Sequence, residues 1–420
     1  MAPAWNARKG KTGPAGSGTA GRERALLESP ALAAPLAELL TPRRMVLESW
    51  THQRTFDRPG AGVTALWQMT ALDPAGERIT LYAGATTSQA AARGGVLRTA
   101  VAGTPLFLWL HPHDPLLPDL PWALSPPRIA QAVFRDADGR DAVLRMNGYR
   151  PLRRAVVHAS SRGRQAYIKV VLPSHADGLQ QRHQLLAGTA VPAPALLPGA
   201  EGRSAVVLSP LPGIPLLREL TSGTSRITAA DLTGLLDALP EAALDLRRRP
   251  AWAERARAYG HAAAGVLPEQ RTEIDVLSTE IAALVADLDP GPVVPVHGDF
   301  YEGNLLTSAG RITGLLDVDG LGPGHRVDDL ACFLGHLTVL ARLSPGTALP
   351  GRLADMRPSL EAAATDAGSS ASALNARAAG VALSLVAGAR GGRLDRRANA
   401  GRRLAAAHSL LHRARDGRDA

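Results

Sequence analysis

The sequence contains very little cysteine and no long apolar run. Cys332 is the one cysteine among 420 residues, which excludes an intrachain disulfide framework and any zinc site built from several cysteines. Because Cys332 lies in the apolar context DDLACFLGHL, we expect a buried, unreactive thiol on a helix face. No uninterrupted apolar stretch approaches the roughly 20 residues that cross a bilayer. The basic start lacks the apolar segment of a secretory signal, so we expect a cytoplasmic protein without a membrane partner.

Lysine is equally scarce. The chain has 47 Lys and Arg residues in total, and the only lysines are Lys9, Lys11 and Lys169. Wherever a general positive charge would serve, this chain uses arginine. A compact ammonium at position 169 therefore indicates a role that a planar guanidinium would not fit, although composition also leaves open the chance survival of one exposed lysine.

The formal net charge of +9 permits an anionic partner. Many of the arginines gather near the C-terminal end, but no aromatic residues are interleaved with them and no nucleic-acid-binding module is recognisable. We therefore expect a solvated helix face there and no nucleic acid partner.

The length predicts more than one packed unit. We divide the chain into a disordered tail (1–23), a β-rich N-terminal extension with a proline-rich connector (24–127), a small β-rich lobe (128–213) and a mostly helical lobe (214–420). In the extension, a helical segment from Arg24 to Leu40 precedes three strands. The proline-rich stretch from Thr104 to Pro127 excludes regular structure and predicts a stiff connector.

The β-rich lobe is expected to begin with three consecutive strands. They are AVLRM, RRAVVHAS and QAYIKVVL, joined around Asn147-Gly148 and around Ser161 to Gly163, with Lys169 in the third strand. The segment Arg58-Pro59 to LYAG resembles the segment Arg150-Pro151 to AYIKVV, with Gly84 where the second copy has Lys169. This likeness indicates either an internal duplication or two hairpins that are similar by accident. Beyond Gly213 the pattern predicts helices around 229–246, 251–264, 270–287, 327–343 and 375–413.

Oxygen-bearing side chains follow two apolar strands in VVPVHGDFYEGNLLTSAGRITGLLDVDG. The first strand runs into Asp299, with Asn304 five residues later, and the second delivers Asp317. Buried strands hold such loops rigidly and let their side chains meet at one point. An amide oxygen and a carboxylate make a partial cage for Mg²⁺, which keeps several waters. Asp299 is then available to accept a proton from an attacking hydroxyl, as in the kinase template with its Asp-x-x-x-x-Asn spacing.

These motifs carry a resemblance to a known family. HGDFYEGN, LLDVDG and the Asp-Leu-Ala of 329–331 resemble the aminoglycoside phosphotransferase family, whose kinase-like fold is related to that of choline kinase and the protein kinases. The resemblance implies an α+β, protein-kinase-like two-lobe fold with ATP and Mg²⁺ as cofactors. It implies that Asp299 is catalytic, that Asn304 and Asp317 bind magnesium, and that Lys169 holds the ATP phosphates. By the same likeness, His297 braces the loop.

Two features depart from the family pattern. The helix after Lys169 offers no acidic residue at a comfortable spacing, only Gln180, Gln181, Arg182 and His183. No Gly-rich loop precedes Lys169. In addition, N-capping would explain at least one of Asp328 and Asp329, and Asp319 belongs either beside the metal or to the structure of the loop.

The sequence thus predicts transfer of the ATP γ-phosphate to a hydroxyl of a small molecule. The arginine-rich C-terminal end argues mildly against a polycationic acceptor, so a sugar or amino alcohol, as in maltose kinases or choline kinase, fits at least as well. The alternative is a degenerate kinase-like protein that binds a nucleotide or a partner without turnover. The sequence does not identify the acceptor, the oligomeric state or the role of residues 1–127.

Overall fold

A computed structural model describes residues 19–58, 61–93, 95–136, 141–389 and 393–417. The chain forms two compact units: unit 1 comprises residues up to 180 together with 196–210, and unit 2 comprises 181–195 together with 211 onward. Helix α5 (Pro173–Leu186) runs from the first unit into the second. In the described ranges, no helix is long and apolar enough to cross a membrane.

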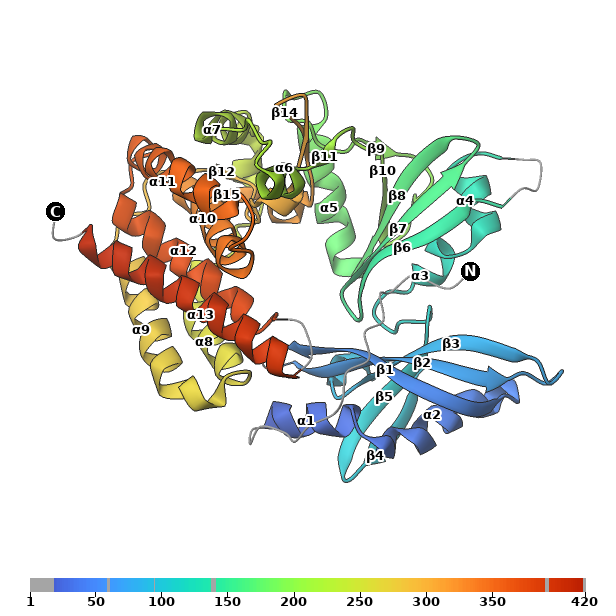
Figure 1. The fold of residues 1–420 in the computed structure, drawn as a ribbon. Coiled ribbons are helices and arrows are strands. Elements are labelled where there is room, and N and C mark those ends of the chain that lie inside the picture. Colours follow the sequence, from blue (N-terminus) through green and yellow to red (C-terminus); the bar gives the residue numbers. More distant parts are fainter. Residues whose placement is uncertain (1–18, 59–60, 94, 137–140, 390–392, 418–420) are drawn as a thin grey trace. The chain divides into compact units, whose positions relative to one another are not determined.

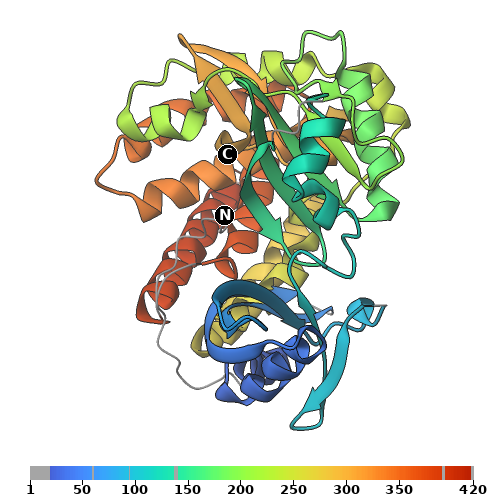
Figure 2. The same cartoon turned by 90° about the vertical axis from the view of Figure 1, so that its right-hand side faces the viewer.

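A five-stranded antiparallel sheet forms the start of unit 1. Its strands are β1 (Val46–Arg58), β2 (Gly62–Leu72), β3 (Arg78–Thr86), β4 (Leu97–Val101) and β5 (Thr104–Leu110), in the order β1-β2-β3-β5-β4. Helices α1 (Thr19–Leu27) and α2 (Ala33–Leu40) cover one face (Figures 1 and 2). Alternate residues of β2, from Val63 to Ala71, pack against these helices because side chains alternate across a strand. The predicted helical segment and strands are confirmed, and α1 begins inside the predicted tail, of which residues 1–18 lie outside the described residues.

A second five-stranded antiparallel sheet repeats the order of the first. It contains β6 (Val143–Arg150), β7 (Arg154–Ser161), β8 (Arg164–Val171), β9 (Leu196–Leu197) and β10 (Ala205–Leu208), in the order β6-β7-β8-β10-β9. One face of β8 (Ala166, Ile168, Val170) joins a core with α3 (Leu120–Ala123) and α4 (Pro126–Ala132). The other face, which carries Lys169, packs at Val171 against α5.

The predicted absence of regular structure between Thr104 and Pro127 is wrong. This stretch contains β5, α3 and the start of α4. Pro105 is the second residue of β5, and the prolines of α3 and α4 occupy the first two helical positions. A helix leaves the first N–H groups unpaired in any case, so proline is tolerated there.

The predicted turn at Asn147-Gly148 is also wrong. Strand β6 continues through both residues, and its register against β7 shifts between Met146 and Gly148, which marks a β-bulge. The chain turns instead at Leu152, which has a φ of 60°. The second predicted turn is confirmed, since Arg162 (φ 50°) and Gly163 (φ 76°) supply the positive φ values that tight hairpins require.

Unit 2 is mostly helical. Its helices are α6 (Leu216–Ser222), α7 (Ala229–Asp237), α8 (Ala256–Ala264), α9 (Arg271–Asp287), α10 (Arg326–Leu343), α11 (Leu349–Asp366), α12 (Ala371–Val386) and α13 (Arg393–Asp416). The single helix predicted over 375–413 is two helices, α12 and α13, which lie side by side (Figure 1). Helix α12 ends just before Gly388, as expected for a residue that favours helix termini. Helix α11 was not predicted.

Two small sheets complete unit 2 and position the candidate site. One pairs β12 (Val293–Val296) with β15 (Gly322–His325), and the other contains β11 (Ile214–Pro215), β13 (Leu305–Ser308) and β14 (Arg311–Leu315). The predicted strands around 293–296, 305–306 and 312–316 are confirmed. Helix α10, which follows β15, is buried along most of its length in the core of unit 2 and includes the buried, free thiol of Cys332, as predicted.

A buried polar network ties the two sheets of unit 1 together. The Asp114 carboxylate accepts hydrogen bonds from the Tyr149 hydroxyl (2.8 Å) and from the backbone N–H groups of Leu152 (2.7 Å) and Leu116 (2.9 Å). Trp109 of β5 donates its indole N–H to the same tyrosine oxygen at 3.3 Å. Asp114 is only 3% exposed, so water cannot replace these partners.

We expect Asp114→Asn to lower the free energy of unfolding by about 1–3 kcal/mol, because an amide N–H₂ group would replace one of two oxygens that face donors. Urea denaturation monitored by tryptophan fluorescence measures the change. Asp73→Asn is the matched control, since the Asp73 carboxylate also accepts two backbone N–H bonds but lies in an exposed turn. Equal effects of the two substitutions would contradict the role assigned to the network.

Candidate functional site

Two loops of unit 2 carry the predicted acidic and amide residues. Strand β12 leads into the first loop (297–304), which contains Asp299 and Asn304. Strand β14 leads into the second loop (316–321), which contains Asp317. Because both loops leave short strands held in small sheets, their starting points are fixed by backbone hydrogen bonds.

Leu316, the residue before Asp317, is held by the first loop from both sides. Its N–H donates to the backbone carbonyl of Asn304 at 2.8 Å, and its carbonyl lies 2.9 Å from the Nε2 of His297. These bonds use backbone groups of the second loop, so they hold its path independently of the side chain at 316. The two loops therefore converge, which brings Asp299, Asn304 and Asp317 into one region of unit 2.

Glycines allow the two backbones to touch. A Cβ atom at Gly298, which has a φ of +78°, would lie 2.8 Å from the carbonyl oxygen of Gly320. A Cβ atom at Gly320 would in turn lie 2.6 Å from the carbonyl oxygen of His297. Real Cβ atoms essentially never come this close to backbone, so only glycine fits at both positions.

His297 acts as a fully buried link between the loops. Its Nδ1 accepts a hydrogen bond from the Asp299 N–H at 3.3 Å, so Nε2 must carry the proton that it donates to the Leu316 carbonyl. Burial lowers the pKa of His297, and the carbonyl contact and nearby carboxylates oppose this shift. A neutral histidine with both nitrogens engaged is a brace, as the sequence analysis expects, and not a proton carrier.

The predicted metal ligands offer oxygen atoms of the right kind. Asn304 is 6% exposed, and its side-chain N–H₂ donates to the Asp299 carbonyl at 2.9 Å, which leaves its amide oxygen as the group available to a cation. Asp317 is half-buried and has a left-handed backbone (φ 58°, ψ 51°), a strained conformation for a residue other than glycine. Its carboxylate adds the charged oxygen that a hard cation prefers.

The oxygen atoms of Asn304 and Asp317 suit magnesium better than they suit a metal ion whose ligands all come from the protein. In the part of the chain that the structure describes, no group of three or more His, Cys, Asp or Glu side chains is arranged to hold an ion. Mg²⁺ commonly takes one or two protein oxygens together with waters and phosphate oxygens. Asn304 and Asp317 supply such a pair.

Lys169 lies in unit 1, near the centre of β8. It is 6% exposed and pairs with Val156 of β7 and Val206 of β10, so both neighbouring strands hold its backbone. Lys169 is therefore not an exposed lysine that is present by chance, the alternative that composition allowed. In the described ranges it is the only lysine.

Asp328 and Asp329 do not cap α10, contrary to the prediction. The N-cap residue is His325, and no side chain caps the helix. Asp328 forms an ion pair with Arg377 at 2.6 Å. Asp329 is fully buried, and its two oxygens accept the N–H groups of His297 (2.7 Å) and Gly298 (2.8 Å). Burial raises the pKa of Asp329 to about 7, against the effect of these two donors.

Sequence reasoning missed Tyr301 and Glu302, which separate Asp299 from Asn304. The Tyr301 ring stacks on the ring of His336 in α10, with 4.1 Å between the ring centroids. Burial, followed by the charge of Asp299, raises the pKa of Tyr301. Glu302 is 3% exposed, and its Oε2 atom has no hydrogen-bond partner among the described residues. Burial and then Asp299 raise the pKa of Glu302 to about 7. The sequence did offer a signal for Glu302, since it is an acidic residue only three positions after Asp299.

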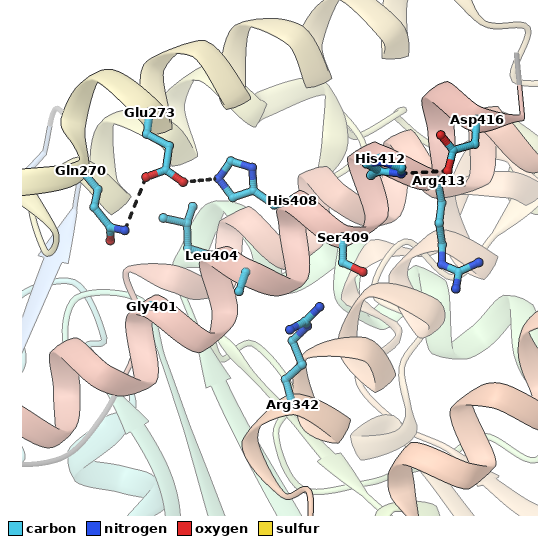
Figure 3. Close-up of a pocket in the computed structure, with 11 residues that line it drawn as sticks. Gln270, Glu273, Arg342, Gly401, Leu404, His408, Ser409, His412, Arg413 and Asp416 are labelled. Carbon is cyan, nitrogen blue, oxygen red and sulfur yellow. Dashed lines mark hydrogen bonds and ion pairs between the residues drawn. The ribbon is translucent and has the colours of Figure 1, made fainter. Parts of the chain in front are cut away.

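A hollow of about 650 Å³ lies elsewhere in unit 2, along α13 (Figure 3). Its lining includes Gln270, Glu273 of α9, Arg342 of α10, and residues of α13. The Glu273 carboxylate lies 2.8 Å from the Nε2 atom of His408, and this contact already joins α9 to α13 there. None of the predicted site residues lines it, so we do not assign the nucleotide to this hollow.

We expect Asp329→Ala to destabilise the protein by about 2–5 kcal/mol, because it leaves two buried backbone donors without acceptors. Thermal and urea denaturation measure the loss. Asp355→Ala is the control, since Asp355 is exposed and pairs with Arg352 only at 3.8 Å, and we expect a change within about 0.5 kcal/mol. A loss at position 329 no larger than at position 355 would contradict this account of the loop.

Three comparisons place the chain among known proteins. No curated protein matches it. A solved structure of a thermostable mutant of aminoglycoside phosphotransferase APH(4)-Ia, with ADP and hygromycin B, is 16% identical and covers 65% of this chain and 95% of its own, with a TM-score of 0.44. Ethanolamine kinase Pv091845 from Plasmodium vivax is 11% identical over 67% of this chain and 87% of its own (TM-score 0.43). Macrolide 2′-phosphotransferase MphH from Brachybacterium faecium is 20% identical over 63% of this chain and 93% of its own (TM-score 0.39).

The third comparison is with protein families. The model of a family described as "Phosphotransferase enzyme family" matches residues 128–363, which is more than half of the chain and contains every predicted site residue. The chain has a β-rich N-terminal part and a mostly helical C-terminal part, so the predicted kinase-like α+β fold class is confirmed. The chain therefore belongs to the phosphotransferase enzyme family.

Proposed function

We propose that this phosphotransferase moves the γ-phosphate of ATP, with Mg²⁺, to a hydroxyl group of a small molecule. The observation that carries the proposal is the double attachment of Leu316 to His297 and Asn304, which holds a proton acceptor and two metal ligands in one place. Phosphoryl transfer depends mostly on such positioning and on charge neutralisation.

Asn304 and Asp317 are the residues that would hold the magnesium ion. When bound, Mg²⁺ neutralises charge on the phosphate oxygens. The contribution of the chain is to keep the amide oxygen of Asn304 oriented. The hydrogen bond from the Asn304 N–H₂ group to the Asp299 carbonyl serves this purpose, because it fixes which end of the amide faces the cation.

Asp299 is the proposed general base. Its backbone is held at both ends, by His297 through the N–H and by Asn304 through the carbonyl. Its side chain is half-buried, so it remains open to an acceptor hydroxyl. A positioned carboxylate contributes about 10²–10⁴-fold to such reactions.

Lys169 is proposed to bind the ATP phosphates. Burial on a central strand holds the stem of this side chain, while a compact ammonium suits a point contact with phosphate oxygens. The rarity of lysine in this arginine-rich chain supports the same role.

The contacts of the α13 arginines bear on the charge of the acceptor. Several arginines of α13 are already engaged: Arg415 pairs with Glu280 of α9, Arg397 pairs with Glu269 just before α9, and Arg403 donates to the Leu385 carbonyl. These pairings weaken the argument from composition against a polycationic acceptor. The proposed acceptor is therefore any small hydroxylated molecule, with a sugar, an amino alcohol and an aminoglycoside as the classes to test.

A second candidate is a member of the family that binds a nucleotide or a partner without turnover. The observation that favours it is the lack of a buried acidic residue on α5, whose one carboxylate, Asp177, is exposed. Purified protein incubated with ATP, Mg²⁺ and a panel of hydroxylated acceptors separates the two functions. Tight nucleotide binding without transfer to any acceptor would favour the second.

We expect Asp299→Asn to lower kcat by about 100-fold or more while nucleotide binding persists, since the amide cannot accept the hydroxyl proton. Coupled assays of ADP release give kcat, and calorimetry gives the nucleotide affinity. Asp275→Asn, an exposed site on α9, is the control and should match the wild type. Unchanged turnover in the Asp299 variant would reject the base assignment.

Lys169→Ala is expected to reduce kcat/KM by about 100-fold or more, the scale of a lost contact to developing charge. Lys169→Arg should recover little, because the guanidinium is broader and makes a fork-shaped contact. Steady-state kinetics with ATP as the varied substrate measure both variants. Near wild-type activity of the arginine variant would show that the scarcity of lysine has no functional meaning at this position.

A further inference from the structure

Helix α5 carries a basic pair where a kinase-like site would carry an acid. Its two buried polar side chains are Arg182 and His183, which are 6% and 4% exposed. Both belong to unit 2. The His183 ring contacts the Pro194 carbonyl at 3.0 Å, which connects the helix to the segment that follows it. Arg182 makes a different kind of contact.

Arg182 donates its Nε–H to the carbonyl of Leu321 at 2.9 Å. Leu321 ends the second loop of the candidate site, four residues after Asp317 and directly after Gly320. Burial lowers the pKa of Arg182, as does the charge of Arg249, whereas the carboxylate of Asp319 in the same loop raises it. The guanidinium is therefore bonded to the end of this loop and feels the charge of its Asp319 carboxylate.

Arg182 completes the support of Asp317. The loop is held before Asp317 by the two bonds to Leu316, and after it by the bond from Arg182 to Leu321. Asp317 itself has a left-handed backbone, which costs of order 1–3 kcal/mol and persists only when its surroundings enforce it. Anchors on both sides of Asp317 meet this requirement.

A buried guanidinium is costly to desolvate, so it is a poor choice for general stability. Its planar guanidinium donates in fixed directions, which suits a directed bond to a backbone carbonyl. These properties are the ones needed to fix the path of a loop.

We propose that Arg182 is a positioning residue, which holds the second loop through Leu321 and so keeps the Asp317 carboxylate oriented toward the metal and nucleotide. The effect on metal and nucleotide rests on the proposed function, whereas the effect on the loop does not. The helix thus contributes to the site through a cation that binds the metal-ligating loop.

Two matched substitutions test the proposal. Arg182→Met and His183→Leu each replace a buried polar side chain by an apolar one of similar size, and each leaves one backbone carbonyl without its donor. Arg182→Lys keeps a positive charge that can reach the same carbonyl. Denaturation curves of all three variants report the general loss of stability.

Hydrogen–deuterium exchange of the free protein gives the first readout. In the peptide that covers residues 317–325, we expect exchange about tenfold faster in Arg182→Met and unchanged in His183→Leu, because a charge-assisted hydrogen bond is lost only in the first. Equal exchange rates in Arg182→Met and the wild type would overturn the proposal, whatever the function of the protein.

Nucleotide binding titrated with Mg²⁺ gives the second readout. Arg182→Met should raise the Mg²⁺ concentration for half-maximal binding about tenfold, Arg182→Lys should recover part of this, and His183→Leu should leave it unchanged. An unchanged Mg²⁺ dependence in Arg182→Met would overturn the positioning role even if exchange were faster. If the wild type bound no nucleotide with Mg²⁺, the proposed function would fail, and the exchange result would still decide whether Arg182 holds the loop.

Discussion

The candidate site depends on the attachment of one backbone segment, at Leu316, to the loop that contains Asp299 and Asn304. Its N–H and its carbonyl are both engaged, by the Asn304 carbonyl and by His297. A second layer supports the first, since Asp329 holds the backbone N–H groups of His297 and Gly298. Asp299 and Asp317 are half-buried and Asn304 is buried, and backbone bonds hold the two loops that carry them.

The two sheets of unit 1 use one plan for different purposes. Both have the same strand order, and Gly84 of β3 and Lys169 of β8 each lie on the third strand of their sheet. A Cβ atom at Gly84 would lie 2.2 Å from the ring of Trp109, so the indole occupies the place that a lysine side chain would need. Trp109 in turn donates to Tyr149 of the second sheet. At this position the first sheet makes a packing contact, whereas the second sheet carries the lysine for which phosphate binding is proposed.

The elements that differ from the sequence-based predictions do so for local physical reasons. Prolines between Thr104 and Pro127 indicated a connector, but a proline at a strand start or in the first helical turn costs no hydrogen bond. Asn147-Gly148 has the composition of a hairpin turn, yet a bulge uses the same backbone freedom. The two acids at the start of α10 looked like caps, because proximity in sequence said nothing of His297 and Arg377, which are distant along the chain.

The sequence by itself determined the residue types of the site and their order, because the spacing of Asp299, Asn304 and Asp317 along strands and loops follows from local chemistry. It also determined most strands and helices, through the periodicity of apolar residues. Only the tertiary structure decided how the site is held: the bond from Arg182 to Leu321 joins residues 139 positions apart, and Asp329 reaches back 32 residues to His297. Such contacts depend on how helices pack, and no local pattern records that packing.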